Sequence, residues 1–293
     1  MRRLAAAIAL AAISAASSAR AGGMECWVDN GAVVVPARFA QPGFGDVTGD
    51  FILDLSAPHS QLHLTTAQGD GMGDAAQARG MLTLAGRRIA ASLAIANLDA
   101  RQWGFPTTLN GVLGADVLGG YMVELRFAPC RLTLWRRAPP AARAEATLPV
   151  AMVGGVPTVT ATITDGIKAR RGPFALDTGA AGVRIVAAHA RFSRLSARVD
   201  PLSRDQPPAR LAAMSLDGQV FRDLPAALQD DAPDGLLGGI GTDVWSRYAL
   251  RLDLRRGQLA LISPPALAGV SAPRSSRSPG SSRRAAGRRA RGR

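Results

Sequence analysis

The chain has 293 residues, a formal net charge of +13, two cysteines and three histidines. This length suits two modest lobes or one large domain. The histidines (His59, His63 and His189) and the cysteines show no metal-ligand spacing, so the composition argues against a metal site.

The first 21 residues are typical of an export signal. Two arginines precede an apolar run from 4 to 16, and Ala19-Arg20-Ala21 matches a cleavage site. The run is too short and too rich in alanine to span a bilayer well, although an uncleaved N-terminal anchor is the alternative. We expect an exported protein, periplasmic or secreted, whose mature chain begins near Gly22.

Cys26 and Cys130 are the only cysteines. In an exported protein, an even pair of cysteines favours one disulfide. Such a bridge would tie the mature N-terminus to the end of the first half of the chain. Two independent thiols are the alternative.

Short alternating runs, broken by Gly, Pro and Asp, predict a mostly β fold. Long stretches with helical periodicity are scarce. The clearest strands are Val33–Val35, Gln61–Leu64, Met81–Leu84 and Val159–Ile163.

Residues 22–137 are expected to form a first lobe. A buried strand runs into an aspartate at Phe51-Ile52-Leu53-Asp54-Leu55-Ser56-Ala57. A hairpin with Gly86 at its centre follows, and then the motif Gly111-Val112-Leu113-Gly114. The Pro/Ala/Arg-rich stretch 138–147 suits a linker.

Residues 148–266 repeat this order. Phe174-Ala175-Leu176-Asp177-Thr178-Gly179-Ala180 ends a buried strand at a tight turn, where glycine allows the backbone to fold back. A hairpin centred on Gly218 and the motif Gly235-Leu236-Leu237-Gly238 follow, then a short helix at Asp243–Trp245 and a closing hairpin. We match Gly111–Gly114 with Gly235–Gly238 and interpret the halves as an internal repeat.

This order of motifs resembles one lobe of the retropepsin-like and pepsin-like aspartic proteases. Two such halves in tandem resemble the two-lobe, pepsin-like form, which covers nearly all of the chain outside its two ends. The resemblance implies two β-barrel lobes that face each other across a cleft, with Asp54 and Asp177 brought together. It also implies that the hairpins at Gly86 and Gly218 act as flaps over this cleft.

The resemblance further implies an endopeptidase that acts on peptides or proteins. Two carboxyl groups share a water, and one acts as base while the other holds a proton. Thr178 and Gly179 would support the catalytic loop. No metal and no cofactor are required, and a monomer is expected.

The first half departs from the family pattern. Leu55 replaces the usual Thr or Ser, so one half of the hydroxyl clasp between the lobes is lost, and Ser56 replaces the usual Gly. Ser56 could supply a substitute hydroxyl. The alternative function is therefore a pseudoprotease that binds extended peptides without cutting them. Trp103 and Phe105 could line a pocket, but core packing is favoured for both.

The segment 267–293 contains eight arginines and no acidic residue, which predicts a disordered tail. Its charge suits contact with an anionic surface, and a third hypothesis makes the lobes a scaffold for this tail. A serine hydrolase is not favoured, because no Gly-x-Ser-x-Gly elbow is present. A phosphate-binding loop is not favoured, because no Lys-Ser/Thr follows Gly238–Gly241.

Overall fold

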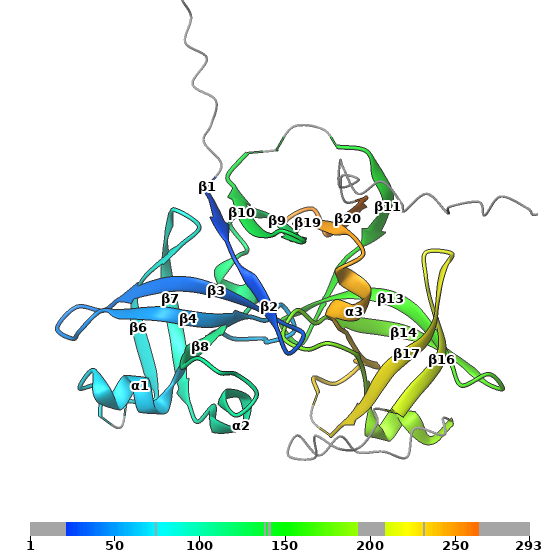
Figure 1. Cartoon of the computed structure of the whole chain (residues 1–293), viewed down its shortest axis with the longest axis horizontal. Helices are drawn as coiled ribbons and strands as arrows, with labels where there is room; N and C mark the ends of the chain where they lie inside the picture. The colour runs from blue at the N-terminus through cyan, green and yellow to red at the C-terminus, as the bar shows by residue number, and fades with distance from the viewer. Residues whose placement is uncertain are drawn as a thin grey trace, which may run out of the picture.

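A computed structural model describes residues 22–73, 75–137, 139, 142–192, 209–230 and 232–263. Two β-rich lobes lie side by side, joined by a third sheet (Figure 1). The predicted mostly β, two-lobe architecture is confirmed. The expected export signal and the Arg-rich tail lie outside the described residues. Within the described part of the chain, no helix is long and apolar enough to cross a membrane.

The first lobe is a seven-stranded sheet in the order β2-β3-β4-β8-β5-β7-β6, and β3 also pairs with β6. That extra pairing closes β3 to β8 into a barrel around an apolar interior. Short helices connect the strands. The elements are β2 (Trp27–Asp29), β3 (Ala32–Ala40), β4 (Val47–Leu53), β5 (Gln61–His63), α1 (Leu64–Gly69), β6 (Gln77–Leu84), β7 (Arg87–Ala96), α2 (Asp99–Gln102), β8 (Leu109–Leu113) and η1 (Ala115–Val117).

The second lobe has the same strand order, β12-β13-β14-β18-β15-β17-β16, and the same kind of closing pair, β13 with β16. The helix expected at Asp243–Trp245 is present. The elements are β12 (Ala151–Val153), β13 (Val156–Thr164), β14 (Ala169–Leu176), β15 (Val183–Val186), η2 (Ala187–Phe192), β16 (Ala209–Leu216), β17 (Gln219–Gln229), β18 (Gly238–Ile240) and α3 (Thr242–Trp245).

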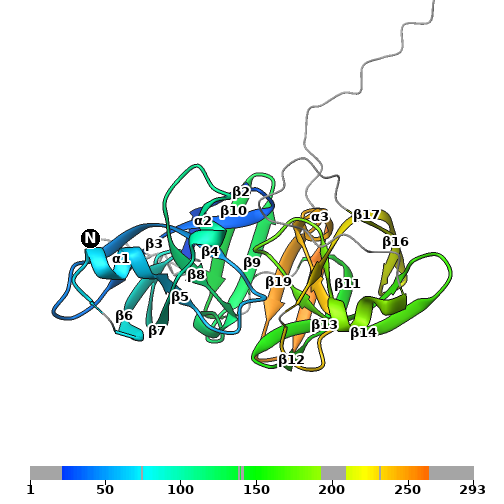
Figure 2. The same cartoon turned by 90° about the horizontal axis from the view of Figure 1, so that it is seen from below.

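The third sheet combines strands from both halves of the chain, and Figure 2 shows β9 and β19 between the lobes. Across that pair, Arg251 donates to the buried carboxylate of Glu124 at 2.8 Å, which adds a polar link between the two halves of the chain within the third sheet. In sheet order the strands are β1 (Gly22–Glu25), β10 (Cys130–Trp135), β9 (Met122–Phe127), β19 (Ala249–Asp253), β20 (Gln258–Ile262) and β11 (Ala144–Pro149).

The predicted linker 138–147 is partly wrong. Its C-terminal part belongs to β11, which pairs antiparallel with β20. The side chain of Leu148 is buried in the main core, and the neighbouring residues of β11 are more exposed. Edge pairing with β20 therefore makes a strand out of a stretch whose composition indicates a linker.

The strands that precede the two aspartates are buried on both faces at their C-terminal ends. Phe51, Ile52 and Leu53 end β4, and Phe174 and Leu176 lie at the end of β14, all with at most 1% exposure. Both strands lie inside their sheets, each with a parallel neighbour, so side chains on both faces are covered. This burial fixes the point at which each strand leaves its barrel, and the residue at that point is the aspartate.

The match of Gly111–Gly114 with Gly235–Gly238, which comes from aligning the two halves of the sequence, is wrong by three residues. In the first lobe, Phe51 pairs with Gly111 across parallel strands. In the second lobe, the equivalent Phe174 pairs with Gly238 rather than with Gly235. Gly111 and Gly238 are both required by close packing, because an added Cβ would collide with the carbonyl oxygen of Gln61 or Arg184, respectively. The strand pairing therefore identifies the equivalent motif as Gly238–Gly241.

The predicted disulfide joins Cys26 and Cys130, with their Cα atoms 5.0 Å apart. It lies between β1 and β2 on one side and the start of β10 on the other. The bridge spans a separation of 104 residues and ties the chain just after β1 to the start of β10, its neighbour within the third sheet.

Candidate active site

Asp54 and Asp177 occupy matching positions at the ends of β4 and β14. The backbone N–H of Asp54 donates to Leu113 at 2.9 Å, and that of Asp177 donates to Ile240 at 3.0 Å. Both side chains are fully buried. A Cβ added to Gly179 would lie 2.5 Å from Asp54 Oδ2, so the loop of the second lobe packs directly against the carboxyl group of the first. The structure thus brings the two predicted aspartates together.

Backbone and hydroxyl donors orient each carboxyl group. The N–H and the Oγ of Ser56 donate to Asp54 Oδ1 at 2.9 and 2.6 Å. The N–H of Gly179 donates to Asp177 Oδ1 at 3.0 Å. Ser56 therefore supplies the substitute hydroxyl that the sequence suggested. Its backbone N–H also donates to the aspartate of its own loop, as the N–H of Gly179 does in the other lobe.

The clasp between the lobes is one-sided. The Oγ1 of Thr178 donates to Leu53 at 2.6 Å and accepts from the backbone N–H of Leu55 at 3.0 Å. Leu55 has no hydroxyl to return the contact, and its side chain is buried in the main core. The interface gains other links from β3 and the turn before it, since Val33 donates to Thr178 at 2.8 Å and Thr242 Oγ1 donates to Gly31 at 2.6 Å.

Two arginines contact the aspartates, and neither was expected as a site residue from the sequence. Arg101, from α2, donates through Nη2 to Asp54 Oδ2 at 2.8 Å. Arg184, from β15, forms an ion pair with Asp177 Oδ2 and donates to Ser56 Oγ at 3.2 Å. Each lobe therefore places one guanidinium beside the carboxyl group of its own loop.

The two carboxyl groups have opposite pKa shifts. Burial raises the pKa of Asp54, but the charges of Arg101 and Arg184 and the hydrogen bonds from Ser56 and Arg101 outweigh it, so this pKa lies below the ordinary 3.8. Burial also raises the pKa of Asp177. There, the nearby charge of Asp54 adds to burial, and Arg184 only partly opposes them, so the pKa of Asp177 lies above its ordinary value. Between the two values, Asp54 is ionised and Asp177 holds a proton.

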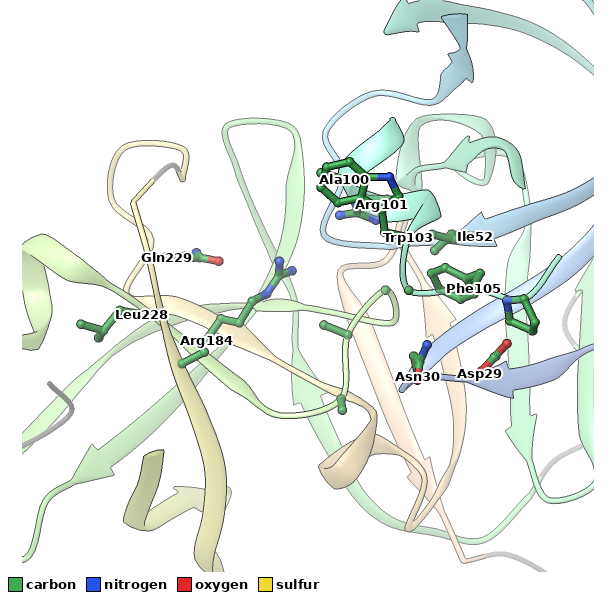
Figure 3. A pocket seen from close by; sticks show the side chains of 16 residues that line it. Asp29, Asn30, Ile52, Ala100, Arg101, Trp103, Phe105, Arg184, Leu228 and Gln229 are labelled. Atoms are coloured by element: carbon green, nitrogen blue, oxygen red, sulfur yellow. The ribbon is translucent and has the colours of Figure 1, made fainter. Parts of the chain in front are cut away.

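Two cavities lie beside this pair; Asp54 lines the smaller one, and Asp177 lines neither of the two. The larger, of about 1030 Å³, lies between the lobes and is lined by Ile52, Trp103, Phe105 and Leu228 (Figure 3). The smaller, of about 240 Å³, is lined by Asp54 and by apolar residues such as Pro58 and Leu236. Arg101, Arg184 and Gln229 line both cavities.

The preference for core packing is wrong for Trp103, a residue that is 59% exposed and lines the larger cavity. Phe105 does both, because it lines this cavity and packs against the small core cluster around Ile52. The two aromatic residues thus give the cleft an apolar wall.

The hairpins at Gly86 and Gly218 are not flaps, which corrects the prediction. Beside Gly86, the N–H of Ala85 contacts Met24 Sδ at 3.1 Å, and Arg87 donates to Leu134, so this turn packs on the third sheet. Beside Gly218, Gln219 accepts from the hydroxyl of Tyr248. Both turns project to the side of the third sheet, opposite α1 and α2 (Figure 1).

The described residues contain no cluster of three or more His, Cys, Asp or Glu side chains suited to a metal ion. No donor set at the aspartate pair favours one either, because two guanidiniums flank the carboxyl groups.

Comparison with known proteins identifies the fold. No family model matches the sequence, and no curated protein matches it. Among solved structures, an aspartic proteinase from Irpex lacteus is similar, with a TM-score of 0.53 and 14% identity over 83% of this chain and 97% of that chain. At this identity, the likeness concerns the fold alone. The chain thus has the two-lobe, pepsin-like β fold, with Asp54 and Asp177 at the junction of its lobes.

Proposed function

We propose that the chain is an aspartic-type endopeptidase whose acid–base pair is Asp54 and Asp177. The observation that carries this proposal is the meeting of two buried carboxyl groups from matching loops, with opposite pKa shifts. Such a split assigns the two roles that peptide hydrolysis needs, a base and an acid.

In the proposed reaction, ionised Asp54 takes a proton from a water, whose oxygen bonds to the scissile carbonyl carbon. Asp177 gives its proton to the carbonyl oxygen, which yields a neutral tetrahedral diol. The C–N bond then breaks as Asp54 passes its proton to the leaving nitrogen. Asp177 recovers a proton from a hydroxyl of the diol as the new carboxyl group forms. The pair returns to its starting protonation state.

A second candidate is peptide binding without cleavage. It is favoured by the full burial of both carboxyl groups, by the ion pairs with Arg101 and Arg184, and by the one-sided clasp at Leu55. In that case the cavity between the lobes would hold an extended peptide, and the aspartates would only anchor the arginines.

Proteolysis across pH distinguishes the candidates. For the endopeptidase, we expect a bell-shaped dependence of kcat/KM on pH with a denatured protein as substrate. The acid limb falls below 3.8, where Asp54 takes up a proton, and the alkaline limb lies above 3.8, where Asp177 loses one. The assay runs from about pH 2 to about pH 7 with and without pepstatin. Folded protein that cuts nothing across this range would contradict the endopeptidase, and peptide binding would be tested next.

We also propose that the protein is exported, because the Cys26–Cys130 disulfide suits an oxidising compartment. N-terminal sequencing of the protein recovered outside the cytoplasm should begin near Gly22. Protein found only in the cytoplasm with its cysteines reduced would contradict this. We further propose that the Arg-rich segment 267–293 contacts an anionic surface. This proposal rests on the charge of the segment alone.

A further inference from the structure

The arginines at the aspartate pair come from opposite lobes and line both cavities of the cleft. Arg184 reaches from the second lobe into the space that Arg101 and Trp103 border on the first (Figure 3). Their side chains are 29% and 34% exposed, so both are held largely inside the protein while one side stays open to the cleft.

Neither guanidinium has all its donors satisfied. Arg101 Nη1 and Arg184 Nε are buried and have no hydrogen-bond partner among the described residues. A buried donor without a partner costs free energy, so arginines that served only to hold the aspartates would be poorly placed. The spare donors suit an acceptor that arrives with a ligand.

The charges around the pair do not balance. At a pH between the two pKa values, where Asp177 holds its proton, two guanidiniums face the single negative charge of Asp54. The smaller cavity has no other charged residue in its lining, so one positive charge is left without a counterpart there. In the larger cavity the additional charged group is Asp29, which Figure 3 places apart from Arg184.

The smaller cavity has room for a side chain. Its volume is about 240 Å³, several times the roughly 30 Å³ that one water occupies in the liquid. Planar guanidiniums with parallel N–H groups match the geometry of a carboxylate, which accepts two such bonds at once.

We propose that Arg101 and Arg184 recognise a carboxylate of the substrate, on a residue within about two positions of the scissile bond. This rests on the endopeptidase proposed above and names its substrate class, acidic peptides. The carboxylate is that of an Asp or Glu side chain, because a free C-terminus this close to the scissile bond would be the substrate of a carboxypeptidase. On binding, it takes up the guanidinium donors and loosens their hold on Asp54 and Asp177, which leaves the pair free to contact the water and the scissile bond.

The experiment compares matched peptides on the full chain. A peptide library first locates the bonds that are cut, by mass spectrometry. Pairs are then made that differ only by Glu against Gln next to such a bond, each with a free or an amidated C-terminus. We expect kcat/KM to be about 10-fold or more higher for the acidic member, because a site built for a carboxylate rejects its amide. The amidated peptides are the control: the preference should persist in them, and a preference that amidation abolishes would contradict recognition of a side chain.

The variants Arg184→Gln and Arg101→Gln test the assignment. Each should bring the Glu-to-Gln ratio close to one, whatever its effect on overall activity, and Arg184→Lys should restore part of the ratio. Arg210→Gln is the matched control, since Arg210 pairs with Asp223 on an exposed part of β16 and should leave the ratio unchanged. Because the ratio is internal to each variant, a general loss of activity does not obscure it.

Anisotropy with labelled forms of the same peptides separates this proposal from the endopeptidase itself. Cleavage with equal rates for Glu and Gln peptides would overturn the carboxylate site and leave the endopeptidase standing. Stronger binding of the Glu peptide that depends on Arg184, without cleavage, would support the site and reject the endopeptidase. Neither cleavage nor preferential binding would overturn both.

Discussion

The substitution Asp177→Asn is expected to lower kcat/KM for a denatured protein by at least about 10³-fold. The amide has nearly the shape of the carboxyl group, so the hydrogen bond from the Gly179 N–H and the contacts of Thr178 should persist. An amide, however, cannot pass a proton to the scissile carbonyl oxygen or take one back. The loss should therefore appear in kcat, with thermal unfolding showing that the protein remains folded.

Asp243→Asn provides the control for this measurement. Asp243 belongs to the same lobe and lies in α3, but its side chain is exposed to solvent. It should keep the activity of the unsubstituted protein. If Asp177→Asn cleaves as fast as Asp243→Asn, then Asp177 is not the acid of the reaction.

Gly238→Ala is expected to lower the free energy of unfolding by about 4 kcal/mol or more, at the upper end of effects of single substitutions. Gly238 is buried in β18 between β14 and β15. The added Cβ would collide with the carbonyl oxygen and carbon of Arg184 in the neighbouring strand. Backbone atoms in a central strand cannot turn aside as a side chain can, so the strands would have to separate.

Urea unfolding measures this effect, and Gly119→Ala is the matched control. No heavy atom lies within 4 Å of a Cβ added to Gly119. The free energy of unfolding of the Gly119→Ala variant should therefore differ from that of the unsubstituted protein by no more than about 0.5 kcal/mol. Equal unfolding curves for the two variants would contradict the close packing of β18 on β15.

Features that depend on local pattern could be predicted from the sequence. Apolar runs that end in Asp54 and Asp177 indicate buried strands that stop at a carboxyl group, and the structure has both. Two cysteines in a chain whose first residues predict an export signal indicate a disulfide, and the structure has it. The strand ends can be inferred from a few consecutive residues, and the disulfide from the number of cysteines. Neither inference needs to know which distant segments meet in the fold.

Features that depend on how distant segments meet could not be predicted. Arg184 lies in the alternating strand Val183–Val186 and has the pattern of an outward-facing polar residue. Arg101 lies in a helix of four residues with the composition of a surface turn. Only the packing of barrel and loop places each guanidinium on an aspartate. The prediction that the hairpins at Gly86 and Gly218 are flaps is wrong for the same reason. An alternating pattern predicts a hairpin, but it does not predict the side of the barrel to which the turn projects.

Titration of the aspartate carboxyl groups by carbon-13 NMR tests the central claim, that Asp54 and Asp177 form one coupled pair. We expect one midpoint below and one above 3.8, and we expect Asp54→Asn to lower the pKa of Asp177, because the charge of Asp54 contributes to raising it. Two independent titrations near 3.8, with Asp177 unaffected by Asp54→Asn, would contradict the claim.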